Sequence, residues 1–188
     1  MRAFLATGVA AGLMAAPALA QSAPPTYPPP TSAQNTWNTI GDIGAVALPV
    51  GAAVMTWAER DKNGFIQLVE TGGATLATVT ILKYAADTTR PNGESYSFPS
   101  GHTAGAAAAA GFVTARYGWK RGLPFQLGAA ITGFARVESG AHYWYDVVAG
   151  AAIGEGFAFL FTRRLREDVR VSAVGDSKGG LVTVSATF

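Results

Sequence analysis

The sequence of 188 residues contains no cysteine, has only two histidines, and is poor in charge. The absence of cysteine excludes a disulfide, a thiol nucleophile and a zinc–thiolate site. Charged residues make up 14% of the chain and the formal net charge is +2, which is too small to indicate a nucleic-acid partner. Large apolar residues rarely form long runs, because Gly and Ala are interspersed throughout. The composition therefore describes one apolar domain with few groups capable of chemistry.

The N-terminal residues have the pattern of an exported protein. Residues 1–20 combine a basic Arg2, an apolar run and the small-residue end Ala18-Leu19-Ala20. We interpret them as a cleaved signal peptide, with an uncleaved membrane anchor as the alternative. Residues 21–35 contain five prolines and predict an extended linker.

The rest of the sequence predicts an all-α bundle of about five core helices over residues 36–166. The breaks contain Gly, Pro and Asn, and they place helices at about 36–60, 65–87, 100–117, 123–138 and 141–165. Pro49 predicts a kink in the first helix. Residues 167–188 alternate apolar and polar side chains around a Gly-rich turn, which predicts a short C-terminal β-hairpin.

Three short clusters contain most of the groups suited to catalysis. The first is Lys83 followed by Arg90-Pro91, the second is the run Pro99 to His102, and the third is Arg136, His142 and Asp146. Each cluster lies where two predicted helices meet. In an antiparallel bundle, all three should therefore lie at one end of the domain.

The clusters supply the groups needed to hold a tetrahedral oxyanion and attack it. Ser100 can cap the third helix, and the free N–H groups that follow, starting with Gly101, would then face an anion. The cations Lys83, Arg90 and Arg136 would neutralise that anion.

The two histidines are suited to different steps. His142 and Asp146 are four residues apart, so a helix would place them on one face, with the carboxylate orienting the imidazole as a nucleophile. His102, from another helix, would be the general acid. A structural histidine is the ordinary alternative for each residue alone, and solvated helix ends are the alternative for the cations. The three ordered clusters together favour a site.

These motifs resemble those of the type 2 phosphatidic acid phosphatase superfamily, which also contains bacterial acid phosphatases and vanadium haloperoxidases. The shared pattern is K-x6-RP, PSGH and R-x5-H-x3-D, and it falls within residues 65–160. The superfamily usually has a serine before the arginine, where this chain has Ala135. The resemblance implies a helical fold, a phosphohistidine at His142, and no metal or other cofactor. It also implies that Lys83, Arg90, Ser100, Gly101 and Arg136 bind the phosphate.

The predicted function is therefore metal-independent hydrolysis of a phosphomonoester or of a lipid or isoprenoid phosphate. A vanadium haloperoxidase and an inactive lipid-binding relative are the alternatives. The expected partner is a phosphorylated lipid or small phosphomonoester, with membrane association and no nucleic acid. The sequence gives no oligomeric state.

Two features of the sequence give opposing indications of where the protein is located in the cell. The end opposite the clusters is basic, as in a membrane protein with that end in the cytoplasm; its cations are Arg60, Lys62, Lys120, Arg121, Arg163, Arg164 and Arg166. The helices are only weakly apolar, however, and Glu70 and Glu155 fall within them. We predict a periplasmic enzyme, with the inner membrane and a periplasm-facing site as the alternative.

Overall fold

The computed structural model describes residues 26–165, 169–176 and 179–186. The signal peptide predicted at residues 1–20 lies outside these residues. The bundle consists of five helices: α1 (Ser32–Ala58), α2 (Lys62–Ala86), α3 (Gly101–Tyr117), α4 (Trp119–Glu138) and α5 (Trp144–Phe161). The all-α prediction with five helices is confirmed.

Some helix ends differ from the prediction because of local capping. Helix α1 begins at Ser32, inside the predicted linker, because Thr31 and Gln34 form a capping box. Helix α5 begins at Trp144, three residues later than predicted, and ends at Phe161. Helix α1 continues through Pro49.

The C-terminal segment contains strands β1 (Val169–Asp176) and β2 (Gly179–Ala186). They pair antiparallel, from Val169 opposite Ala186 to Asp176 opposite Gly179.

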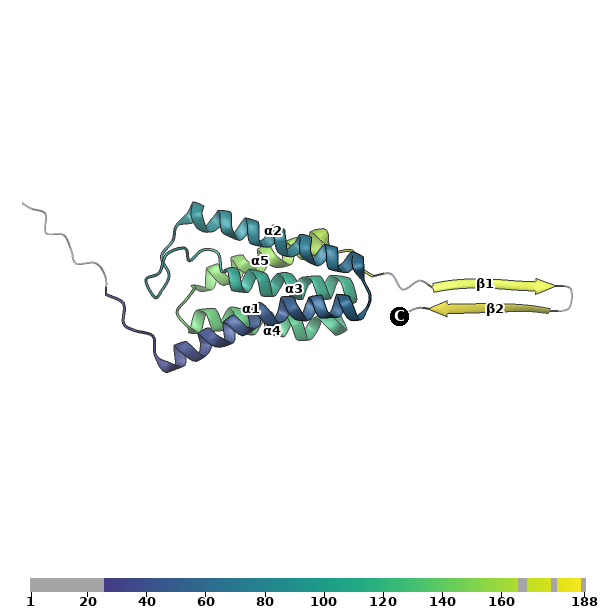
Figure 1. The fold of residues 1–188 in the computed structure, drawn as a ribbon, viewed down its shortest axis with the longest axis horizontal. Helices are drawn as coiled ribbons and strands as arrows, with labels where there is room; N and C mark the ends of the chain where they lie inside the picture. The colour runs from purple at the N-terminus through teal and green to yellow at the C-terminus, as the bar shows by residue number, and fades with distance from the viewer. Residues whose placement is uncertain (1–25, 166–168, 177–178, 187–188) are drawn as a thin grey trace, which may run out of the picture.

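Helix α3 forms the centre of the bundle, with the other four helices around it (Figure 1). Its buried residues include the alanine run 106–110 and Phe112. Helix α5 packs directly on the α3 backbone through small residues at four-residue intervals: Gly150, Gly154 and Ala158 are all buried. A Cβ on Gly154 would lie 2.3 Å from the Ala104 carbonyl oxygen. Small residues therefore set the separation of α3 and α5.

Large apolar side chains lie mainly on the outside of the bundle. Exposed residues of this kind lie on α1, α2, α4 and α5; examples are Val46, Ile66, Leu76, Ile131 and Phe159. Helices α1, α2 and α5 are long and apolar enough to cross a membrane by length and composition. Small residues inside and large apolar residues outside are typical of helices packed in a bilayer. The average apolarity of each helix is weak, so the sequence alone did not predict this arrangement.

Candidate active site

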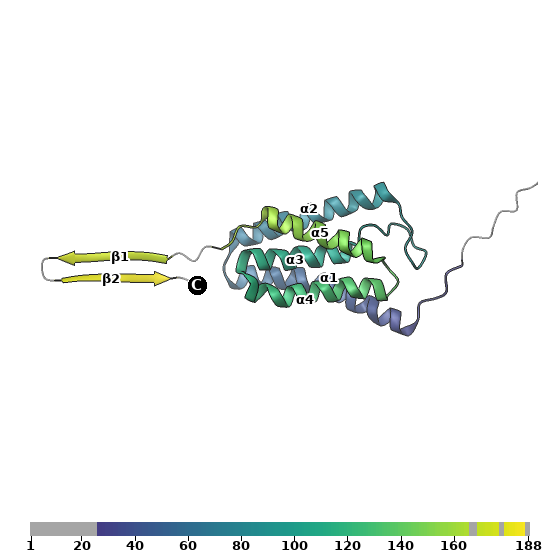
Figure 2. The same ribbon diagram turned by 180° about the vertical axis from the view of Figure 1, so that it is seen from behind.

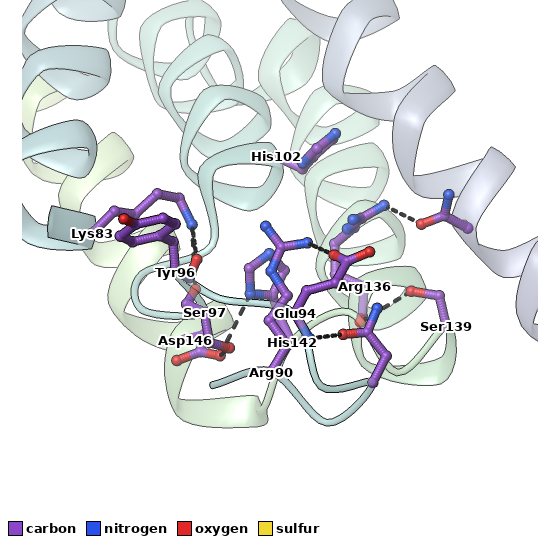
Figure 3. Close-up of polar contacts among 12 residues, drawn as sticks. Lys83, Arg90, Glu94, Tyr96, Ser97, His102, Arg136, Ser139, His142 and Asp146 are labelled. Carbon is purple, nitrogen blue, oxygen red and sulfur yellow. Dashed lines mark hydrogen bonds and ion pairs between the residues drawn. The ribbon is translucent and has the colours of Figure 1, made fainter. Parts of the chain in front are cut away.

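The three sequence clusters lie together at one end of the bundle, as predicted. Lys83 lies in the last turn of α2, His102 in the first turn of α3, and Arg136 in the last turn of α4. The loop from α2 to α3 brings Arg90, and the short connection from α4 to α5 brings His142 (Figure 3).

His142 and Asp146 form a buried pair. Their side chains are 1% and 0% exposed, and His142 Nδ1 lies 3.5 Å from Asp146 Oδ2. That oxygen also accepts hydrogen bonds from Ser97 Oγ at 2.5 Å and from the Tyr143 backbone N–H at 2.9 Å. These two hydrogen bonds hold the carboxylate beside the imidazole. It faces Nδ1 of the imidazole, so Nε2 is the ring nitrogen left for another partner.

The surroundings of His142 keep its imidazole neutral. Burial, followed by the nearby cations Lys83, Arg90 and Arg136, lowers the pKa of His142 to about 3. A neutral ring retains a lone pair at physiological pH, which a nucleophile requires.

Lys83 and Arg90 are held by the loop between α2 and α3. The Lys83 ammonium donates to the carbonyl oxygens of Tyr96 at 2.6 Å and Ser97 at 3.4 Å. Arg90 donates to the Glu94 carboxylate at 2.6 Å. Glu94 is well exposed, so the pair lies at the solvent side of the site and an anionic ligand can replace this carboxylate.

Helix α1 adds two residues that the sequence analysis missed. The buried guanidinium of Arg136 donates to Asn38 Oδ1 at 2.8 Å and to Asp42 Oδ1 at 2.9 Å. The same Asp42 oxygen lies 3.2 Å from His102 Nε2. One carboxylate therefore connects the predicted general acid to a predicted phosphate-binding cation. Asn38 and Asp42 belong to no motif, and only the approach of α1 to α4 reveals them.

The N-terminus of α3 has the predicted cap. Ser100 is fully buried, and its hydroxyl accepts a hydrogen bond from the Thr103 backbone N–H at 3.4 Å. The Ser100 N–H itself donates to the Asp146 carbonyl at 3.0 Å, which joins the start of α3 to α5. The first turn of α3, whose N–H groups have no partner within the helix, therefore lies at the end of the bundle that contains the site.

Several polar atoms at the site are buried without a hydrogen-bond partner among the described residues: His142 Nδ1, Asp146 Oδ1, Arg90 Nε and Arg136 Nε. Buried polar groups are normally satisfied, and exceptions require an explanation. The two guanidinium nitrogens are available to an anionic ligand, whereas His142 Nδ1 faces the Asp146 carboxylate.

Ala135 is fully buried on the face of α4 that meets α1. Its Cβ lies 3.6 Å from where a Cβ on Gly41 would be. The position of the missing serine therefore faces the α1–α4 contact, and the neighbouring Arg136 keeps its place in the site.

The structure is a helical bundle in which two histidines and three cations lie together at one end. The sequence profile described as the PAP2 superfamily matches residues 78–170. A lipid A 4'-phosphatase of Helicobacter pylori is 37% identical over 139 residues, covering 68% of this chain and 70% of that protein. The chain belongs to the PAP2 superfamily.

Two solved structures are similar in fold. The crystal structure of Aquifex aeolicus LpxE has a TM-score of 0.59 at 22% identity, covering 68% of this chain and 83% of that one. A transmembrane PAP2-type phosphatidylglycerolphosphate phosphatase from Bacillus subtilis has a TM-score of 0.54 at 25% identity, covering 68% and 74%. The predicted relationship to the superfamily is confirmed.

Proposed function

We propose that this protein is a membrane-bound lipid phosphatase that hydrolyses a phosphate monoester through a phosphohistidine. Membership of the PAP2 superfamily, together with the 37% identity to a lipid A 4'-phosphatase, supports a phosphoric ester hydrolase. The observation that carries the mechanism is the buried, neutral His142 fixed against Asp146 among three cations.

In the first step, Nε2 of His142 attacks phosphorus and the bond to the leaving oxygen breaks. Lys83, Arg90, Arg136 and the N-terminus of α3 stabilise the charge on the three equatorial oxygens. Asp146 stabilises the imidazolium that forms. His102 donates its proton to the leaving oxygen, which departs as an alcohol.

In the second step, water attacks the phosphohistidine and the phosphorus–nitrogen bond breaks. His102 now accepts the proton of that water, and inorganic phosphate leaves with His142 neutral again. Asp42 lies 3.2 Å from His102 Nε2 and can hold the ring in place through both steps.

Two acidic side chains are paired with the cations of the site. Glu94 is paired with Arg90, while Asp42 is paired with Arg136. Both carboxylates are more than half exposed, at 63% and 51%. Phosphate oxygens would displace Glu94 from Arg90 and share Arg136 with Asp42.

A lipid substrate agrees with the outer surface of the bundle. The exposed apolar side chains of α1, α2 and α5 support a position of these helices within a bilayer, which would bring the site to one membrane face. The opposite end is basic, with the described cations Arg60, Lys62, Lys120, Arg121, Arg163 and Arg164. By the positive-inside rule, this charge distribution supports a site on the periplasmic side of the inner membrane.

The ends of the chain complete the proposal. Residues 1–20 would be removed as a signal peptide, which mass spectrometry of the mature N-terminus tests. The C-terminal residues would form a β-hairpin that takes no part in catalysis. A chain ending at Leu165 should therefore retain its rate of phosphate release in detergent.

The test is phosphate release from phosphatidic acid in mixed micelles, after thorough chelation of metals and with or without vanadate. We expect activity in the chelated enzyme and inhibition by vanadate, which becomes five-coordinate on a histidine nitrogen and mimics the transition state. Loss of activity that magnesium or zinc restores would contradict the mechanism. Bromide oxidation by the vanadate-loaded protein, without phosphatase activity, would instead identify a haloperoxidase.

A further inference from the structure

The structure contains a groove between α4 and α5 that the mechanism does not use. Both helices pack on α3, one on each side of it (Figure 2), and they leave a hollow with a volume of about 770 Å³. Thr103 and Ala107 of α3 form its floor. The walls are apolar and include Ile131 on α4 and Val147 and Ala151 on α5.

One end of the groove is lined by residues that neighbour site residues in the sequence. Aromatic side chains line that end, and each lies one or two residues from a site residue. Trp37 precedes Asn38, Phe134 precedes Arg136 by two residues, and Trp144 follows His142 by two residues. Phe134 contacts both tryptophans, with ring centroids 5.4 Å from Trp37 and 6.1 Å from Trp144.

The other end of the groove is polar. Gln126 of α4 donates to the Glu155 carboxylate of α5 at 2.8 Å, and both residues line the groove. The carboxylate lies over Gly111 of α3, where a Cβ would come within 2.4 Å of Glu155 Oε2. This pair connects the two walls and interrupts their apolar surface.

The length of the groove matches one leaflet of a bilayer. Trp144 and Glu155 are eleven residues apart on α5, which corresponds to about 16 Å of helix. The hydrocarbon core of a bilayer is about 30 Å thick. A groove that starts at the site and ends at the polar pair therefore runs from the membrane surface to about the middle of the bilayer.

We propose that this groove binds one acyl chain of the substrate, with the phosphate in the site and the chain end near Glu155 and Gln126. The inference rests on the proposed function and specifies its substrate class: a phosphate ester carried directly on an acylated lipid. The groove would lower KM for a long-chain substrate by burying the chain against protein. A soluble phosphomonoester would not use it.

The test uses variants that fill the groove from each wall. Ala130→Phe fills it from α4 and Ala151→Phe from α5. Ala152→Phe is the matched control, because Ala152 is exposed on α5 and does not line the groove. Initial rates are measured with oleoyl phosphatidic acid in mixed micelles and with para-nitrophenyl phosphate. We expect kcat/KM for the lipid to fall at least about tenfold in both groove variants, with little change for the soluble ester.

Equal losses on both substrates would mean that the groove variants damage the site, and unchanged rates on the lipid would mean that the chain lies elsewhere. Either result would overturn the inference. A groove variant that fails to fold is replaced by the one on the other wall.

A binding measurement separates this inference from the proposed function. Phosphatidic acid with a diazirine in its acyl chain is photo-crosslinked to the His142→Ala protein, in which hydrolysis plays no part. We expect labelled peptides from 127–134 of α4 and 147–155 of α5, and a weaker signal in Ala151→Phe, His142→Ala. Labelling confined to α1 and α2 would overturn the groove assignment, even if the wild-type protein is an active phosphatase. Labelling of the groove in a protein that hydrolyses no phosphomonoester would instead reject the proposed function alone.

Discussion

The two ends of the bundle each contain buried charges, but their hydrogen bonding differs. At the end away from the site, Asp61 accepts from Arg116 Nε at 2.7 Å and from its terminal nitrogen at 2.6 Å. Asp61 also accepts from Tyr117 at 2.9 Å and from the Gly64 N–H at 2.8 Å. A second terminal nitrogen of Arg116 donates to the Arg163 carbonyl at 2.6 Å.

At the end that contains the site, by comparison, several buried polar atoms have no hydrogen-bond partner within the part of the chain that the structure describes. His142, Asp146, Arg90 and Arg136 each have a buried polar atom with no partner among the described residues. A saturated cluster has no capacity for a ligand and stabilises the fold, whereas an unsaturated one leaves its charges available. The contrast distinguishes the structural ion pair of Asp61 and Arg116 from the pair of His142 and Asp146, for which we propose a catalytic role.

The largest expected effect is at His142. His142→Ala should lower kcat by on the order of 10⁴-fold or more, because it removes the nucleophile. The protein should still fold, since the side chain has a buried Nδ1 without a hydrogen-bond partner. Phosphate release and the thermal midpoint are measured together. Substantial residual turnover in the folded variant would show that His142 is not the nucleophile.

Asp146→Asn should lower kcat by about 10³-fold, because an amide cannot stabilise the imidazolium as a carboxylate does. Ser97→Ala is the companion variant, since Ser97 donates to the same oxygen at 2.5 Å. It should cost much less activity than Asp146→Asn. Near-normal rates in folded Asp146→Asn would make Asp146 a structural residue.

At the end of the bundle that contains Asp61 and Arg116, we expect substitutions to lower the stability of the fold. Arg116→Met leaves the Asp61 carboxylate buried without its partner, which costs about 3–5 kcal/mol. Arg121→Met is the matched control, because its pair with Glu59 is exposed, at 48% and 30%, and should be worth less than about 1 kcal/mol. Thermal unfolding in detergent measures both. Similar midpoints for the two variants would remove the distinction between the ends.

The KM of the Arg116→Met protein that remains folded should be unchanged, since Arg116 lies at the end of the bundle opposite His142. A raised KM with a normal thermal midpoint would mean that this end also contributes to substrate binding.

Much of the site could be predicted from sequence because its residues lie in short motifs at helix ends. The spacing of His142 and Asp146 and the position of Ser100 before α3 required only local rules. Asn38, Asp42 and Ser97 could not be predicted in this way. These residues reach the site through tertiary contacts of α1 with α4 and of the α2–α3 loop with α5. Local sequence patterns do not encode such contacts.

The membrane character was underestimated for a related reason. The sequence gives the average apolarity of a helix, and α3 contributes mainly alanine and glycine. Only the packing shows that small residues face inward while Val46, Ile66 and Phe159 face outward. Glu155, which argued against a membrane, is paired with Gln126 inside the groove.

The pH dependence of the two ends should also differ. The pKa of His142 falls to about 3 in the folded protein, below the usual value of 6.5. The unfolded chain therefore binds more protons between these values, and this residue's contribution to stability decreases as pH falls from 6.5 toward 3.

Burial raises the pKa of Asp61, but its hydrogen bonds with Arg116, Gly64 and Tyr117 outweigh that effect and leave the pKa below its usual 3.8. Its contribution is complete above that value and is lost only in stronger acid.

Nitrogen NMR of labelled histidine in a tag-free His102→Gln protein measures the remaining imidazole directly. We expect no titration of His142 between pH 8 and pH 5, because its pKa is held at about 3. A midpoint near 6.5 would mean that the ring is solvated.

The smallest expected effect is that of Ala135→Ser, which restores the residue common in the superfamily. The position is fully buried against α1, and a hydroxyl there can donate to a carbonyl of its own helix. The rate should change by less than about threefold and the stability by less than about 1 kcal/mol. A large gain in rate would mean that the serine hydroxyl contributes to phosphate binding.

The most direct test of the proposed catalytic role of His142 is to trap the phosphohistidine intermediate. Protein is mixed with a phosphate-labelled lipid and quenched in alkali, then digested and mapped; a second sample is treated with acid. The account predicts acid-labile label on His142 and none in His142→Ala. Label on His102, on a serine or on an aspartate would contradict it, as would turnover with no labelled protein.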